Sequence, residues 1–274
     1  MCKNVIINNI TVRNPWYSQN GDGLDVDSCE NVLVINSSFD VGDDAICIKS
    51  GKDEDGRRRA RPCRNLIVDN CIVFHGHGGF VVGSEMSGGV ENIKVSNCRF
   101  LGTDVGLRFK SCRGRGGVVK NIYIEDIVMM NIPTEPLLFD LHYGGKSAVE
   151  AAAEGASPFD VEYVEADETT PQFRDIYIKD VVCSGAARAM YFNGIPEKNI
   201  ENIVVEDCEI VSTKGADLRY SDGVQLRNVN ITQSEGQGYS VANCKNVLIE
   251  DCTDASGSES LNVFQHNSSN VKID

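Results

Sequence analysis

The sequence predicts an all-β chain that folds as a single-stranded parallel β-helix of about ten coils. A short phrase recurs along the chain, mostly at intervals of 21 to 34 residues, and apolar and polar residues alternate within each copy. Gly and Asn stand where corners are expected, and β-branched residues fill the phrases. Periods of this length indicate a solenoid. A leucine-rich repeat is the rival fold, but its Leu framework and its helix-period segment are both missing.

The repeated phrase begins at an Asn and is clearest at 4–9, 31–36 and 65–71. It returns at Asn92, Asn121, Asp175, Asn202, Asn246 and Asn270, with a weaker copy around Gly223. The interval from Asn121 to Asp175 is 54 residues, twice 27, so we expect one degenerate coil inside it. The repeat Asn residues are expected to form a hydrogen-bonded ladder at a turn.

Composition limits the function classes. The chain has 274 residues, 41% of them hydrophobic, and a net charge of −14, which permits a packed core and disfavours nucleic acid as a partner. No apolar run reaches the roughly 18 residues of a membrane helix. The segment from Lys52 to Lys120 nevertheless holds 13 basic and 7 acidic residues. An anionic ligand that binds near this segment is therefore compatible with the negative net charge of the chain. We expect a monomer without nucleic-acid or membrane partners.

Eleven cysteines are present, and none forms a CxxC pair, so the spacing predicts neither a metal site nor a cofactor. Eight of them fall into two positions of the repeat that other copies fill with apolar residues, and we expect these eight to pack as small core residues. They are Cys2, Cys29, Cys63 and Cys244 in one position and Cys71, Cys98, Cys208 and Cys252 in the other. The remaining three are not assigned: Cys47, Cys112 and Cys183.

The residues that the repeat itself does not require are the candidates for a chemical function. Four successive strands end in Ser, at Ser28, Ser50, Ser84 and Ser111. Aligning these serines gives three columns of neighbouring residues: Asp22 with Asp44, Asp43 with His77, and Lys49 with Lys110. Because adjacent strands lie about 4.8 Å apart, three carboxylates and an imidazole meet on one patch, flanked by Arg108 and Lys110.

A patch of like charges costs free energy, so a purely structural protein would avoid it. A calcium-binding Asp ladder is one alternative, but Ca²⁺ prefers six to eight oxygens without adjacent cations. Hydrolysis of a glycosidic bond fits better, with one protonated carboxyl as acid and another carboxylate activating water. The flanking cations would hold a negatively charged sugar.

At these residues the sequence resembles glycoside hydrolase family 28, the polygalacturonase family of right-handed parallel β-helices. The matching motifs are Asn20-Gly21-Asp22, Gly42-Asp43-Asp44, Gly76-His77-Gly78 and Arg108-Phe109-Lys110, followed by Tyr143. The resemblance implies Asp43 as general acid, Asp22 and Asp44 as the pair that activates water with inversion, and His77 as the residue that tunes the acid. It further implies that Arg108 and Lys110 bind a galacturonate carboxylate, that Asn20 and Tyr143 line the site, and that the protein is secreted or periplasmic.

Two positions depart from the family pattern. Gly21 replaces Thr, and Phe109 replaces Ile and should point inward. The alternatives are a pectinase acting on rhamnogalacturonan or xylogalacturonan, a calcium-dependent pectate lyase, and a non-catalytic polysaccharide-binding β-helix such as an adhesin or tailspike module. The last would not need the carboxylates, so Asp43→Asn would leave its binding intact.

Two segments interrupt the repeat. Residues 51–64 carry an acidic and then a basic run and are expected to form a surface loop at the border of the cleft. Residues 144–171 are rich in Ala and acids and are expected to form a surface loop or flap, which could limit the groove as exo action requires. The chain begins inside the first recognisable coil, so we expect residues 1–274 to be one domain that lacks N-terminal coils and a cap.

Overall fold

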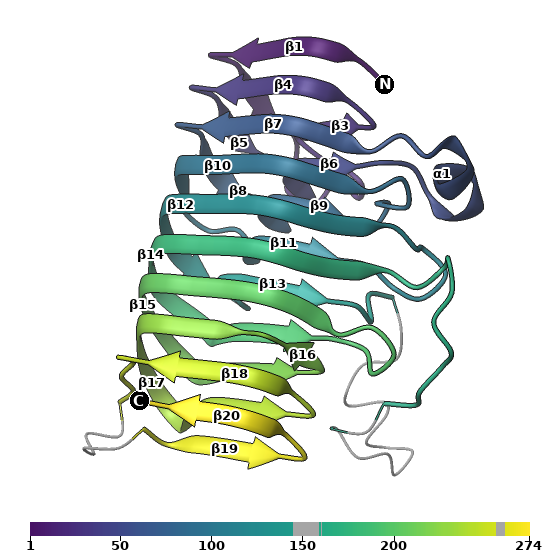
Figure 1. Ribbon diagram of the computed structural model, residues 1–274. Helices are drawn as coiled ribbons and strands as arrows, with labels where there is room; N and C mark the ends of the chain where they lie inside the picture. The colour runs from purple at the N-terminus through teal and green to yellow at the C-terminus, as the bar shows by residue number, and fades with distance from the viewer. Residues whose placement is uncertain (145–158, 160, 256–260) are drawn as a thin grey trace.

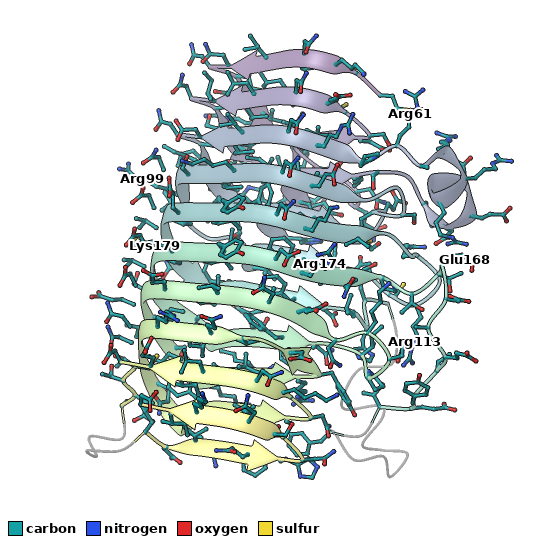
Figure 2. All side chains as sticks on the ribbon, viewed as in Figure 1. Arg61, Arg99, Arg113, Glu168, Arg174 and Lys179 are labelled. Atoms are coloured by element: carbon teal, nitrogen blue, oxygen red, sulfur yellow. The ribbon has the colours of Figure 1, made fainter. Side chains whose placement is uncertain are left out.

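The computed structural model of the chain is a parallel β-helix, as the repeat predicts. It describes residues 1–144, 159, 161–255 and 261–274. Figure 1 shows the strands stacked coil upon coil from the N-terminal end to the C-terminal end, and Figure 2 shows the side chains on the same view. Every pairing between the strands named below is parallel, and paired strands stand one coil apart in the sequence.

The coils present three faces. The strands confined to one face are short, and five long strands bend around corners from one face to the next. The first face contains β1 (Lys3–Asn8), β4 (Glu30–Ile35), β7 (Cys63–Asp69), β16 (Ser221–Asp222), β18 (Lys245–Glu250) and β20 (Ser269–Ile273). The second face contains β2 (Thr11–Arg13), β5 (Ser38–Asp40) and β8 (Ile72–His75). The third face contains β3 (Leu24–Asp27), β6 (Asp44–Lys49), β9 (Gly78–Gly83), β11 (Val105–Lys110), β13 (Leu137–Asp140) and β19 (Val263–His266). The long strands are β10 (Val90–Phe100), β12 (Val118–Ile132), β14 (Gln172–Asn193), β15 (Ile200–Arg219) and β17 (Gln225–Ala242).

The repeat Asn residues form the expected ladder. Each adopts a left-handed backbone conformation, for example Asn31 at φ 58° and Asn121 at φ 55°, which Asn tolerates better than most residues do. Their side chains bond from coil to coil: Asn31 Nδ2 donates to Asn4 Oδ1 at 2.9 Å, and Asn121 Nδ2 donates to Asn92 Oδ1 at 3.2 Å. Each repeat Asn therefore provides the left-handed residue of the turn, and its side-chain amide forms a hydrogen bond with the neighbouring coil.

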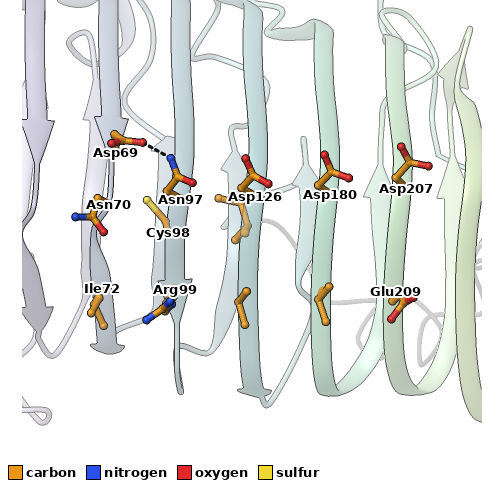
Figure 3. A pocket seen from close by; sticks show the side chains of 13 residues that line it. Asp69, Asn70, Ile72, Asn97, Cys98, Arg99, Asp126, Asp180, Asp207 and Glu209 are labelled. Atoms are coloured by element: carbon orange, nitrogen blue, oxygen red, sulfur yellow. Dashed lines mark hydrogen bonds between the residues drawn. The ribbon is translucent and has the colours of Figure 1, made fainter.

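At a second corner, between the first and second faces, the chain also turns at an Asn or Asp with positive φ. Asp126, Asp180 and Asp207 all have positive φ there, and Figure 3 shows their carboxylates in a row on successive strands. They line an open depression of about 930 Å³. Asn97 Nδ2 donates to Asp69 Oδ1 at 2.7 Å in the same row. The carboxylates of Asp126, Asp180 and Asp207 are thus explained by the corner that they form.

The interior is apolar and includes the cysteines. In the first column Cys29, Cys63 and Cys244 are buried, and Cys2 on the first coil is exposed. In the second column Cys98 on β10 is in register with Ile127 on β12, and Cys71 lies one coil earlier, between β7 and β8. Phe109 points inward, as expected, and stacks on Phe139 with ring centroids 4.5 Å apart. All 11 cysteines are free thiols, and most behave as core residues.

Two expectations about the interruptions need correction. No extra coil separates Asn121 from Asp175, because β12 pairs directly with β14, with Ile122 opposite Ile176. The additional length lies in the segment after β13, and the expected flap at 144–171 falls largely on 145–158 and 160, which lie outside the described residues. Within 51–64 the chain forms a short helix, α1 (Asp53–Arg59), which the repeat pattern did not indicate.

Candidate active site

The third face brings the predicted residues together. Leu24 pairs with Ile46, Ile46 with Phe80, and Phe80 with Leu107. These pairings place the four serines in one row, and the three columns obtained from their alignment are therefore confirmed. The backbone supports the same register, since Gly23 N donates to Asp44 O at 2.9 Å and His77 N donates to Asp43 O at 2.9 Å.

Asp43 is held by neutral donors. Its carboxylate accepts hydrogen bonds from the backbone N–H of Asn20 at 3.2 Å and from its neighbour Asp44 at 2.9 Å. The Nδ1 of His77 lies 3.0 Å from Asp43 Oδ1. Among the residues that the structure describes, no Lys or Arg forms an ion pair with Asp43, which distinguishes it from Asp22 and Asp44.

Asp44 lies between two cations. Its side chain is only 2% exposed, and its two oxygens are contacted by Arg108 Nη1 at 3.1 Å and Lys110 Nζ at 2.7 Å. Both cations come from β11, two strands along the third face from β6. The strand between them, β9, carries Gly83 in register with Lys110, so no side chain there obstructs the long Lys110 stem. Two charged hydrogen bonds thus offset the burial of the Asp44 carboxylate.

Asp22 lies beside Lys49. Lys49 Nζ contacts Asp22 Oδ2 at 3.3 Å and also Asp25 Oδ1 at 2.9 Å. Burial raises the pKa of Asp22 to about 6; Lys49 opposes this rise, and the charges of Asp25 and Asp43 add to it. Asp22 therefore changes its protonation state close to neutral pH, which suits a group that exchanges protons during a reaction.

Tyr143 completes the cluster at the end toward the later coils. Its ring centroid lies 4.9 Å from Lys110 Nζ and 5.8 Å from the guanidinium carbon of Arg108. Its backbone N–H donates to Ser111 O at 3.0 Å, which anchors the ring next to β11. The ring thus packs against the two cations, and Tyr143 as a whole is 37% exposed.

Asp104 and Asp25 belong to this cluster but were not assigned to it from the sequence, and Lys49, which the serine alignment placed in a column with Lys110, had been given no role. Asp104 Oδ2 lies 4.0 Å from His77 Nε2, so His77 stands between two carboxylates. Lys49 and Asp25 form the pair beside Asp22. The serine alignment contained a signal for Asp104, because it precedes Ser111 by seven residues, as His77 precedes Ser84.

One group in the described part of the chain has the composition of a small metal site. Oxygens of Asp22 and Asp44 and the Cys47 Sγ lie within 4.8 Å of one another. Cys47 is fully buried beneath the carboxylates, and burial raises the pKa of its thiol well above the ordinary value. Three ligand atoms are too few for Ca²⁺, and Lys49, Arg108 and Lys110 already supply the positive charge. The donor set therefore does not suit a resident calcium ion.

Only some of the basic residues between Lys52 and Lys120 lie at this site. Arg57 donates to the carbonyl oxygens of Gly114 and Arg115, and Arg115 pairs with Asp53, so α1 is tied to the turn after β11. Other cations of the segment pair with acids on the first face, as Lys120 does with Glu91. The positive charge near the site is therefore due mainly to Lys49, Arg108 and Lys110, rather than to the whole basic segment.

The family model for glycosyl hydrolases family 28 matches residues 1–215. The chain belongs to this family. A probable polygalacturonase of Vitis vinifera is 28% identical over 76% of this chain and 40% of its own length. A polygalacturonase of Ralstonia nicotianae is 33% identical over 69% of this chain and 32% of its own length.

A solved structure is also similar to most of this chain. The exopolygalacturonase of Thermotoga maritima is 31% identical, with a TM-score of 0.72 over 84% of this chain and 47% of that chain. This member of glycosyl hydrolases family 28 thus spans less than half the length of these relatives. None of its described helices is long and apolar enough to cross a membrane.

Proposed function

We propose that this family 28 chain is a polygalacturonase, an inverting hydrolase that cleaves α-1,4 linkages between galacturonosyl residues of pectic chains. The observation that carries the proposal is the clustering of Asp22, Asp43 and Asp44 beside two cations on one face of the β-helix. The polygalacturonases among its relatives support the same substrate class. By the same likeness, we propose a secreted or periplasmic location.

The three carboxylates differ in their partners, which supports different roles. Asp43 has no Lys or Arg partner among the described residues and faces His77, so we assign it the role of general acid. It would donate this proton to the leaving glycosidic oxygen. His77, which bridges Asp43 and Asp104, would then return a proton to the acid between turnovers.

Asp22 and Asp44 would hold the attacking water. Their carboxylates approach each other within 4.8 Å, a spacing that one water molecule can bridge with hydrogen bonds to both. The water would attack the anomeric carbon from the side opposite to the leaving group, and the proton that it loses would go to this pair. Inversion follows from that single displacement.

Arg108, Lys110 and Tyr143 would form the adjoining sugar site. A galacturonate carboxylate would share the two cations with Asp44, and the exposed part of the Tyr143 ring would contact the sugar. Charge-assisted hydrogen bonds of this kind favour a uronate over a neutral sugar.

The deciding experiment is the release of reducing ends from polygalacturonic acid. We expect release by the unmodified chain, a decrease of at least about 10²-fold in Asp43→Asn, and no decrease in Asp55→Asn, which alters an exposed acid on α1. Proton NMR of the first product should show the anomer opposite in configuration to the substrate bond. Retention, or a product that absorbs ultraviolet light at a new double bond, would contradict hydrolysis with inversion.

Rhamnogalacturonan and xylogalacturonan serve as comparison substrates in the same assay. We expect slower release from both, because the proposed site places cations where a galacturonate carboxylate would lie. A folded chain that binds these polymers and hydrolyses none of them would instead be a binding module.

A further inference from the structure

A second aromatic feature lies on the segment that packs against the proposed acid, and the chemistry above does not use it. Trp16 belongs to the segment between β2 and β3, and its ring stacks on His75 with centroids 3.7 Å apart and an interplanar angle of 33°. Its Nε1–H donates to Asp40 Oδ1 at 2.7 Å, and Asp40 also lies 3.1 Å from His75 Nδ1. The indole is therefore fixed in place by a hydrogen bond and a stacking contact.

This fixed ring is nevertheless open to solvent. Trp16 is 61% exposed, and the neighbouring Tyr17 is 89% exposed. Tryptophan is usually among the more buried residues, and an exposed indole loses the free energy that burial of its apolar surface would provide. Because its only polar group is already bonded to Asp40, the exposed surface has no further hydrogen bond to offer. It is suited to an apolar contact.

The segment that carries Trp16 is built directly onto the acid. Asn20 on this segment donates its backbone N–H to Asp43, and Gly42 N and Asp43 N both approach the carbonyl oxygen of Gly21 at 3.3 Å. A Cβ at Gly42 would come within 2.4 Å of Pro15 O, so the segment can pack this closely only against glycine. The partners of the indole, Asp40 and His75, precede Asp43 and His77 by three and two residues. The ring therefore borders the site.

We propose that Trp16 is a stacking platform for a further galacturonosyl ring of the bound pectic chain, on the rim opposite Tyr143. The inference rests on the proposed function, because the occupant is the same chain that Asp43 would cleave. A pyranose presents an apolar face of C–H groups that can lie on an indole, while its hydroxyl and carboxylate groups stay in water. Tyr143 and its cations lie toward the later coils, whereas Trp16 lies at the level of Asp40 and His75. Arg13 is exposed and in register with Asp40 on the next strand, so it supplies positive charge near the uronate.

Trp16 is the sole tryptophan of the chain, so intrinsic fluorescence reports on this ring alone. The experiment titrates trigalacturonate into the Asp43→Asn chain, which should bind the ligand without cleaving it. We expect emission to move to shorter wavelength and quenching by acrylamide to fall at least twofold at saturation. Tyr123→Ala is the matched control, because Tyr123 is also exposed and stacked, on Tyr177 of the first face; it should not change the response.

Calorimetry with variants in the same Asp43→Asn background provides an independent measurement. Trp16→Ala should weaken trigalacturonate binding about tenfold, and Trp16→Phe should lose less. Circular dichroism verifies that each variant is folded, and the fluorescence titration needs no change at Trp16 should the Ala variant fail to fold.

Binding with unchanged fluorescence and unchanged quenching would overturn the platform, and so would the absence of binding. The reducing-end assay on the unmodified chain is a separate measurement. Hydrolysis without any response of Trp16 would therefore reject the platform and leave the hydrolase standing. Protection of Trp16 without hydrolysis would support the platform and reject the hydrolase.

Discussion

His77 Nδ1 lies 3.0 Å from Asp43 Oδ1, and the two residues immediately precede the paired strands β9 and β6. The opposite ring nitrogen lies 4.0 Å from Asp104 Oδ2, so the imidazole connects the proposed acid to a second, half-exposed carboxylate. Because the ring itself is 49% exposed, it can exchange protons with solvent. The arrangement gives Asp43 a proton partner and, in the described part of the chain, no Lys or Arg ion pair.

Replacing His77 should impair catalysis without unfolding the chain. We expect His77→Ala to lower kcat about 10²-fold, because Asp43 loses the group that exchanges protons with it. The melting temperature should change little, since the ring is half-exposed. Asp104→Asn, which alters only the longer contact, should have a smaller effect on kcat. A His77→Ala chain with unimpaired kcat would exclude the proposed role.

Lys49 should set the acid limb of the pH profile. With Asp22 as a base of pKa about 6, kcat/KM should fall as the pH drops below about 6. Lys49 favours the ionised form of Asp22, so Lys49→Met should move this limb to higher pH by about one unit. Lys245→Met, an exposed lysine on β18, serves as the control and should leave the limb in place.

Asp22 should make the stability of the fold depend on pH. Its pKa in the folded state, about 6, is above the ordinary 3.8, so the folded chain binds the proton more tightly and becomes less stable as pH rises from about 4 to 6. Asp22→Asn should therefore unfold at higher urea concentration than the unmodified chain at pH 8. Near pH 3.5 the carboxyl is mostly protonated in both states, and the two urea midpoints should nearly coincide. A difference of equal size at pH 3.5 would point to a cause other than ionisation.

Lys110 and Asp44 should be strongly coupled in stability. Their side chains are 8% and 2% exposed and meet at 2.7 Å, so Lys110→Met would leave a buried carboxylate with Arg108 alone and cost about 3 kcal/mol. The double variant with Asp44→Asn should recover part of this loss, because the unpaired charge is gone. Urea unfolding of the four members of the cycle measures the coupling, and additive losses would contradict it. Activity should remain low in all three variants.

The Asn ladder should contribute through backbone conformation as well as through hydrogen bonds. Asn121 has φ 55° and bonds to Asn92, so Asn121→Ala should cost about 1–2 kcal/mol from left-handed strain together with the lost bond. Asn121→Gly should cost less, since glycine adopts positive φ without strain. Urea midpoints of the two variants compare these effects; equal losses would assign the whole effect to the side-chain bond.

Local pattern predicted much of this molecule because a β-helix repeats one neighbour relationship. Once the serines are aligned, each residue has a known partner one coil away, and this is why the Asp22–Asp44 and Asp43–His77 columns could be placed without coordinates. The error at the 54-residue interval has the same origin. An interval of twice the period suggested an additional, degenerate coil. In the structure β12 pairs directly with β14.

The sequence by itself determined the coil, its corners, the inward positions of the cysteines and the face on which the carboxylates meet, because these follow from periodicity and the left-handed tolerance of Asn. Only the tertiary structure decided which cation serves which carboxylate: Lys49 pairs with Asp22, and Lys110 crosses β9 to reach Asp44. It also placed Trp16 on His75. Long side chains and irregular segments choose their contacts in three dimensions, so a one-dimensional repeat does not encode them.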